Sequence, residues 1–395
     1  MSGGREKLFV SAGCPMELFK PIAPAEKLNR SFKYVCEAPS HAASRSLLQE
    51  VFALLPDPDG NFVLDFQTTG FDARIWELYL SALFFNVGLA LSRPNDRPDF
   101  LVERDGTKVW IEATTANPTQ ESAVPPSEEQ DHWSEQEEIA IKLGSALFSK
   151  MKKEYWNLPH VNGLPLVLAI ADFHRPDPMR SSSAALEGYI YGMHVSLKGN
   201  PSDHDAGYEL QTIEKHTLRN KSIPTGFFQQ PNTEHISAVL FSNAGTIAKF
   251  NRMGLLSGKA RNVKALRFGL AYSPDPDAVM PEPFWYVVGD RNESWEEEAI
   301  VFHNPNALHP IPEGFFGDSI EVFSSDGDYF HKQSGFHVVT SLTQTVVAEN
   351  GSVEDLDLLL RFQADSWLAK VREKQSEMEN QVRTIHDQWP GGRNK

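Results

Sequence analysis

The dipeptide Asp105-Gly106 lies between two apolar runs and predicts a β-hairpin with a two-residue turn. A type I′ turn needs positive φ at both central residues, and Asp-Gly is one of the few dipeptides that readily supply it. With this turn, Arg104 pairs with Thr107, and continuing the pairs outward places Asp99 directly opposite Glu112. The register alone therefore brings two carboxylates together at the far end of an apolar hairpin.

Acidic residues are costly at such positions. Directly opposed residues in an antiparallel pair have β-carbons about 4.5–5.5 Å apart, and like charges there destabilise the pair. Glu77 is the lone acid in an apolar segment, Arg74–Ala90, that reads as a buried helix. Each acid also has an ordinary explanation: a solvated Asp99, a Glu112 paired with a basic residue, and a Glu77 salt bridge to Arg74. Together they predict a bound cation, because buried unpaired carboxylates are unfavourable.

The order of elements around these acids resembles the αββαβ core of the PD-(D/E)xK, or restriction-endonuclease-like, nuclease superfamily. Pro98-Asp99 is similar to the PD of its motif, and Glu112-Ala113-Thr114 is similar to its ExK triplet. An apolar run of strand length, Leu164–Phe173, follows at the place of the last core strand. The resemblance implies an α/β fold with a mixed central sheet, and Mg²⁺ or Mn²⁺ held by Asp99 and Glu112, with Glu77 as an added ligand.

The motif lysine is replaced by Thr114, which shares a strand face with Glu112 but carries no charge. Some members of the superfamily move this lysine to the following helix, and Lys142 is our candidate for the role. Lys150, Lys152 and Lys153 compete with it. The expected catalytic residues are therefore Asp99, Glu112, Thr114 and Lys142.

The 395-residue chain carries a formal net charge of −16, which argues against a general polyanion binder. A basic segment nevertheless stands out, and we interpret it as either a set of DNA phosphate contacts or a solvated face: Arg252, Lys259, Arg261, Lys264 and Arg267. The chain has two cysteines, no apolar start typical of a signal peptide and no membrane-length apolar run. We therefore expect a cytoplasmic protein with no membrane contact.

Changes in composition divide the chain into five parts. They are an N-terminal segment (1–60), the nuclease-like core (61–175), a linker (176–234), an appended α+β region (235–350) and a C-terminal helix with a tail (351–395). We expect a helix near Ala42–Leu55 and, from its alternating pattern, a strand at Asn61–Gln67.

The predicted function is metal-dependent hydrolysis of DNA phosphodiester bonds, in bacterial defence or repair. The alternative is a nucleic-acid-binding or regulatory module on a nuclease-like scaffold that has lost catalysis. The sequence leaves both the catalytic lysine and a homo-oligomeric state open.

Overall fold

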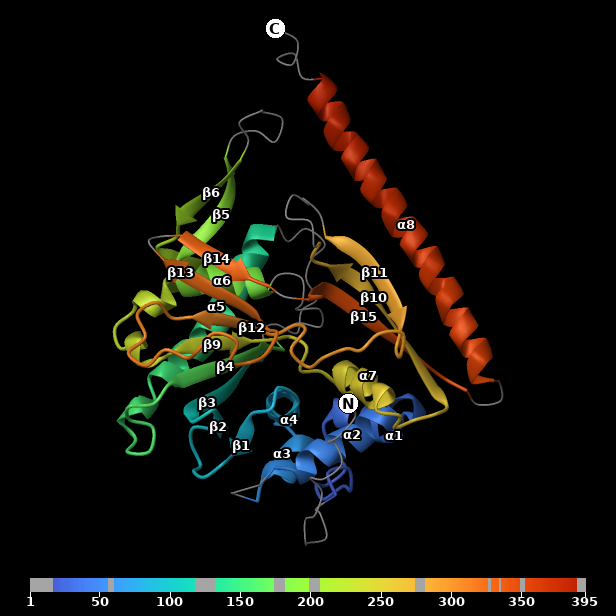
Figure 1. Cartoon of the computed structure of the whole chain (residues 1–395), viewed down its shortest axis with the longest axis horizontal. Coiled ribbons are helices and arrows are strands. Elements are labelled where there is room, and N and C mark those ends of the chain that lie inside the picture. The colour runs from blue at the N-terminus through green and yellow to red at the C-terminus, as the bar shows by residue number, and fades with distance from the viewer. Residues whose placement is uncertain are drawn as a thin grey trace.

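The computed structural model describes residues 17–55, 60–117, 132–173, 182–198, 207–273, 281–325, 328–333, 335–348 and 352–388. An eight-stranded mixed sheet runs through the molecule in the order β1-β2-β3-β4-β9-β12-β13-β14 (Figure 1). Its strands are β1 (Ala90–Ser92), β2 (Phe100–Arg104), β3 (Thr107–Ala116), β4 (Leu166–Asp172), β9 (Ala238–Phe241), β12 (Ile300–His303), β13 (Ile320–Ser325) and β14 (Asp328–Lys332). The α/β class with a mixed central sheet is as predicted.

The hairpin of β2 and β3 has the predicted turn and register. Asp105 and Gly106 take φ values of 50° and 79°, and Arg104 pairs with Thr107. The ladder ends at the pair of Phe100 with Ile111, so Asp99 is the residue immediately before β2.

Helices cover both faces of the sheet, and side chains alternate between them along each strand. Ile111 and Val167 belong to the core on one side, whereas Leu168 and Ile170 belong to the core on the other. The first core is packed by α2 (Ala42–Ala53), α3 (Phe62–Gln67), α4 (Phe71–Asn86) and α7 (Ile247–Leu256), and the second by α5 (His132–Met151) and α6 (Ser182–Tyr191). Because successive strand residues point to opposite faces, Glu112 lies on the α5 side.

The chain from β3 through α5 to β4 forms a parallel crossover unit, since Glu112 pairs with Leu168 in parallel register. Strand β9 adds a further parallel neighbour to β4. Helix α5 therefore starts near the carboxyl end of β3 and runs back along the sheet, which brings its last turn beside the middle of β3.

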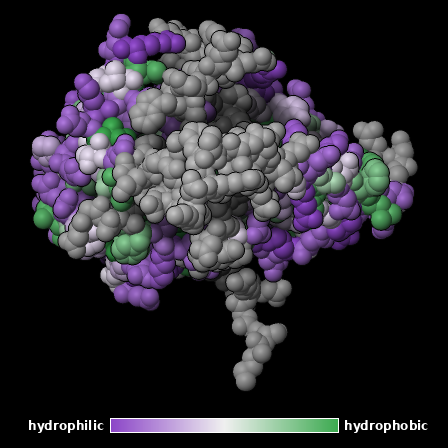
Figure 2. All heavy atoms as spheres, turned by 90° about the horizontal axis from the view of Figure 1, so that it is seen from above, coloured by the Kyte–Doolittle hydropathy of each residue, from purple (hydrophilic) through white to green (hydrophobic). Residues whose placement is uncertain are grey.

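A smaller three-stranded sheet lies beside the main body, in the order β11-β10-β15 (Figure 1). It consists of β10 (Val263–Ala271), β11 (Glu282–Val287) and β15 (Val338–Val347), and helix α8 (Val353–Gln388) packs on it through Leu360 and Ala364. In Figure 2, seen from above, hydrophobic residues gather at the right edge, the side on which α8 lies in Figure 1. Leu358 and Phe362 of α8 are exposed apolar side chains.

The remaining elements are short. They are α1 (Arg30–Glu37), the hairpin of β5 (Met193–Lys198) with β6 (Gly207–Thr212), the hairpin of β7 (Lys215–Leu218) with β8 (Lys221–Pro224), and the 3₁₀ helices η1 (Pro39–His41), η3 (Tyr155–Asn157), η5 (Phe227–Gln229) and η6 (Thr233–His235). None of the helices in the described part of the chain combines the length and apolarity needed to cross a lipid bilayer.

Two expectations about organisation differ from the structure. The segment predicted as a strand at 61–67 is helix α3, because Phe62, Phe66 and Gln67 are buried at helical spacing. The region expected to be appended, 235–350, is not separate as a whole, because its strands β9 and β12–β14 continue the same sheet as β1–β4. Among the described strands of 235–350, β10, β11 and β15 are the ones that form a separate sheet.

Candidate metal centre

Glu112 is a buried carboxylate on β3 with one satisfied and one unsatisfied oxygen. The residue is only 4% exposed. The Oε1 atom accepts hydrogen bonds from Lys150 Nζ at 2.5 Å and from Tyr155 OH at 2.6 Å. The Oε2 atom is buried and has no hydrogen-bond partner. An unpartnered buried acceptor costs about 1–3 kcal/mol, and more when it is charged, so this oxygen requires a water or a cation.

Asp99 lies next to Glu112, as the register predicted. Its Oδ2 accepts a hydrogen bond of 2.7 Å from the backbone N–H of Ala113, which holds the carboxyl group against β3. Burial, then the charge of Glu112, then that of Glu77, raise the pKa of Asp99 to about 7. When no cation is bound, the negative charge of Glu112 therefore makes Asp99 hold its proton more tightly than an isolated aspartate does.

Glu77, from α4, is held by two arginines. Arg74 Nη1 lies 2.9 Å from Glu77 Oε1, and Arg93 Nη2 lies 3.3 Å from Oε2. Burial raises the pKa of Glu77, while the charges of Arg74 and Arg93 oppose the shift. The salt bridge to Arg74, the ordinary explanation offered by the sequence, is thus present.

The three predicted acids do not form a three-carboxylate cage. Among the described residues, the only three metal-binding side chains with ligand atoms all within 4.8 Å are Glu293, Glu297 and Glu298. Glu77 is close enough to act on Asp99 through its charge, but it does not converge with both partners. The geometry fits a metal centre in which Asp99 and Glu112 are the carboxylate ligands and Glu77 is not a ligand.

Lys150, not Lys142, contacts Glu112. The two lysines are eight residues apart on α5, or about 12 Å along the helix axis. Lys150 is in the last turn, which lies beside the middle of β3, and its charge also lowers the pKa of Asp99 and of Glu77. Lys152 and Lys153 are exposed, and Thr114 is half-buried on β3 with no charge to offer. Of the competing lysines, Lys150 is therefore the one that the structure brings to Glu112.

Sequence reasoning missed Tyr155. This residue follows α5 in η3 and packs in a small apolar cluster with Trp110, Val161 and Leu166. Burial and the hydrogen bond to Glu112 raise the pKa of Tyr155, so the phenol remains a donor. Nothing in the local sequence marks Tyr155, because its approach to β3 depends on where α5 ends.

The interpretation of the basic segment as DNA phosphate contacts is wrong for two of its members. Arg267 is 1% exposed and Arg252 is also buried, and both pair with Glu293 inside the protein. Two others are ion-paired, Lys259 with Glu50 and Lys264 with Asp357. Arg261 is exposed. The segment therefore offers no continuous basic path, because its charges neutralise acids of this chain.

The buried arginines belong to an ionic cluster that lies between α7 and the small sheet. Lys249 Nζ lies 2.7 Å from Glu293 Oε1, and Arg267 also bonds Glu298. Although burial alone would raise it, the cations Lys249, Arg252 and Arg267 hold the pKa of Glu293 well below its usual range. Protein cations thus take up the carboxylate oxygens that a metal would need, and we do not assign a metal to this cluster.

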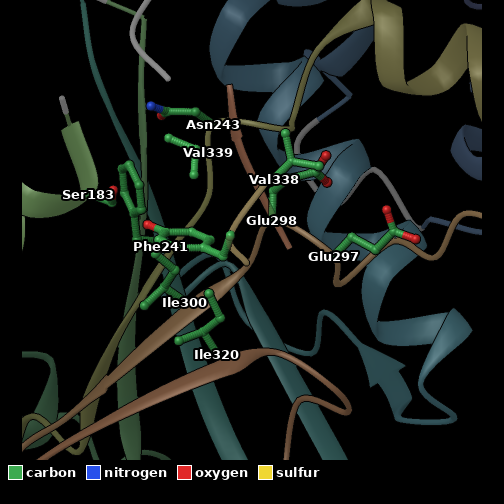
Figure 3. A pocket seen from close by; sticks show the side chains of 10 residues that line it. Ser183, Phe241, Asn243, Glu297, Glu298, Ile300, Ile320, Val338 and Val339 are labelled. Carbon is green, nitrogen blue, oxygen red and sulfur yellow. The ribbon is translucent and has the colours of Figure 1, made fainter. Parts of the chain in front are cut away.

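A pocket lies beside this cluster, at the ends of β9, β12 and β13, and away from Glu112. Figure 3 shows Phe241, Ile300 and Ile320 grouped on one side, with the carboxylates of Glu297 and Glu298 directed away from them. The pocket is therefore mainly an apolar hollow next to the ionic cluster, and it carries none of the predicted chemistry.

Comparisons of this chain with protein-family models, with curated proteins and with solved structures found no match. Inferences about function consequently rest on the site itself.

Proposed function

We propose that the protein is a divalent-metal-dependent nuclease that hydrolyses DNA phosphodiester bonds at Asp99 and Glu112. The observation that carries the proposal is the buried, unpartnered Oε2 of Glu112, next to Asp99 and with Lys150 on the opposite oxygen. The sequence of elements α4, β1–β3, α5 and β4 supports a restriction-endonuclease-like core, with Pro98-Asp99 and Glu112 at the motif positions.

The donor set suits a hard cation. Carboxylate oxygens are the ligands that Mg²⁺ and Mn²⁺ prefer, and Mg²⁺ commonly takes only one or two carboxylates and keeps several waters. When bound, the metal would polarise a phosphodiester oxygen and lower the pKa of a coordinated water. Asp99 would then be fully ionised, with Ala113 N–H fixing one of its oxygens. The hydroxyl group of Tyr155 fixes one oxygen of Glu112 by donating a hydrogen bond to it.

Lys150 takes the role of the missing motif lysine in this proposal. An ammonium group has three N–H donors, and Glu112 engages Lys150 Nζ through one oxygen. The other donors can orient the attacking water or stabilise negative charge that develops on the phosphoryl group. Thr114 contributes neither charge nor proton transfer.

The test is degradation of supercoiled plasmid and of single-stranded DNA with Mg²⁺ or Mn²⁺. We expect activity in the wild type, none in Glu112→Gln or Asp99→Asn, and loss of calorimetric Mn²⁺ binding in both variants. Glu103→Gln is a matched control, because Glu103 is in the same hairpin and its partly exposed side chain pairs only with Lys108 at 3.8 Å. Mn²⁺ binding that survives in both site variants would refute the metal centre.

A second candidate is a DNA-binding or regulatory module without catalysis. It is favoured by the uncharged Thr114 at the lysine position and by the two arginines that already neutralise Glu77. The wild type would then bind Mn²⁺ and DNA but leave both substrates intact.

A further inference from the structure

His160 holds the chain that leads into Asp99. Its Nε2 atom lies 2.9 Å from the carbonyl oxygen of Arg97, two residues before Asp99. A carbonyl oxygen can only accept a hydrogen bond, so Nε2 is the ring nitrogen that carries the hydrogen and donates it. Among the described residues, no other hydrogen bond outside the strand ladders engages the backbone of residues 93–99, which connect β1 to β2. His160 is therefore the main anchor of this connection.

The segment that carries His160 is itself fixed to β3. The indole N–H of Trp110, a residue of β3 that is 2% exposed, donates a hydrogen bond of 2.9 Å to the carbonyl oxygen of His160. The two rings also meet edge to face, with their centroids 5.1 Å apart. His160 is thus anchored to the strand that carries Glu112, through both its backbone and its ring.

The same segment also reaches the second acid. The hydroxyl group of Tyr155 lies 2.6 Å from Oε1 of Glu112. Tyr155 starts the 3₁₀ helix η3, and the backbone N–H of Leu158 bonds back to its carbonyl oxygen at 3.0 Å. One short, internally bonded segment, 155–160, therefore donates one hydrogen bond to Glu112 and another to the chain that ends in Asp99.

Asp99 depends on this anchor because it lies outside the hairpin ladder. The last pair of that ladder joins Phe100 to Ile111, and the carboxyl group of Asp99 caps the backbone N–H of Ala113 beyond it. A metal site needs its ligands held to within about 0.5 Å, and side chains on ladder residues meet this requirement more readily than side chains on connections do. A bond at Arg97 restricts the connection two residues before the ligand.

We propose that His160 is a positioning residue for Asp99 and that, together with Tyr155, it sets the separation of the two acids. The part of the inference that makes Asp99 a metal ligand rests on the proposed nuclease function. The fixing of Asp99 against β3 is a property of the metal-free protein and can be tested separately. His160 contacts no substrate in this assignment and acts through the backbone between Arg97 and Asp99.

Two substitutions separate the donor of His160 from its ring. His160→Gln keeps a side-chain N–H donor but has no ring, whereas His160→Phe keeps a ring against Trp110 and cannot donate. His235→Phe is the matched control. His235 stacks on Trp156 of the same segment, with centroids 4.8 Å apart, and phenylalanine preserves this stacking.

Two quantities are measured for each protein: the calorimetric affinity for Mn²⁺, and the rate of hydrogen exchange at the Ala113 amide without metal. We expect His160→Phe to weaken Mn²⁺ binding about 2- to 10-fold, as for the loss of one hydrogen bond between uncharged groups. Its Ala113 amide should exchange faster than that of the wild type, because the acceptor on Asp99 is held less firmly. His160→Gln and His235→Phe should stay close to the wild type in both measurements.

Wild-type Mn²⁺ affinity or wild-type amide exchange in His160→Phe would overturn the proposal. Equal losses in His160→Gln and His160→Phe would overturn it as well, since the donor would then not be the feature that matters. If the wild type binds no Mn²⁺ but the Ala113 amide still exchanges faster in His160→Phe alone, the proposed metal centre fails and the positioning of Asp99 stands.

Discussion

The protein buries two groups of charged side chains that differ in how completely their atoms are paired. In the ionic cluster near the small sheet, Glu293 contacts Lys249, Arg252 and Arg267. In the acid pair near the hairpin, Glu112 has one oxygen engaged and one without a partner. Both groups combine glutamates with basic residues, so residue types alone do not distinguish them.

The difference shows what distinguishes a structural cluster from a candidate binding site. It is whether each buried charged atom already has a partner within the protein. The ionic cluster is closed, because cations from α7 and β10 meet the acids of the segment before β12. The hairpin site is left with an unsatisfied acceptor, Oε2 of Glu112. The unsatisfied oxygen of Glu112 is the feature that a bound cation would complete.

Breaking the closed cluster should have the largest effect on stability. Glu293→Gln removes the charge that three buried cations share, and uncompensated buried charges cost about 3–5 kcal/mol of unfolding free energy. Urea denaturation measures the loss, and Glu354→Gln on the exposed side of α8 should change stability by less than about 0.5 kcal/mol. An unchanged midpoint in Glu293→Gln would contradict the structural role.

Lys150→Ala should lower the rate of DNA cleavage 100- to 1000-fold, because one positioned donor to a developing charge is worth about 2.7–4 kcal/mol. Mn²⁺ affinity should not weaken, since the ammonium competes with the metal for Glu112. Lys142→Ala is the control and should be close to the wild type. Equal mild losses in the two variants would reject the role of Lys150.

The metal-free protein should lose stability as the pH rises from about 4 to about 7. The pKa of Asp99 is raised to about 7 in the folded state and is near 3.9 in the unfolded state, so folding favours the protonated carboxyl. Its stabilising contribution is fully present below about pH 4 and is lost as the pH rises through about 7.

The contribution of Asp99 can be isolated by measuring unfolding free energies across this pH range. It is the difference between the wild type and Asp99→Asn. Asp99→Asn should be the more stable protein at pH 8 without metal. Saturating Mn²⁺ should flatten the slope in the wild type. Parallel pH curves for the two proteins would show that Asp99 does not titrate in this range.

The smallest effect is expected at the exposed part of the basic segment. Lys264 forms a partly exposed pair with Asp357 at 3.3 Å, and such pairs contribute at most about 1 kcal/mol. Reversing Arg261 and Lys264 to Glu should also leave the salt dependence of DNA affinity unchanged, measured by fluorescence anisotropy. A slope reduced by about 0.7–0.9 per residue would restore these side chains as phosphate contacts.

The sequence by itself determined what depends on local geometry. The Asp105-Gly106 turn fixed the hairpin register, and the register placed Asp99 beside Glu112 because strand pairing advances one residue at a time. Buried helices such as α4 and the continuous apolar strand β4 were also evident from their apolar runs. The short helix α3 was predicted as a strand, because so short an apolar run is compatible with both the helical repeat and the strand repeat.

Only the tertiary structure decided which distant side chains complete or neutralise these acids. Lys142 and Lys150 both flank the apolar stripe of α5, and the choice between them depends on how far the helix runs back along β3. Arg93 reaches Glu77 because β1 pairs with β2, and Arg252 and Arg267 become internal because acids some 30–40 residues later fold against them. Contacts of this kind depend on the docking of whole elements, for which a residue's neighbours in sequence provide no signal.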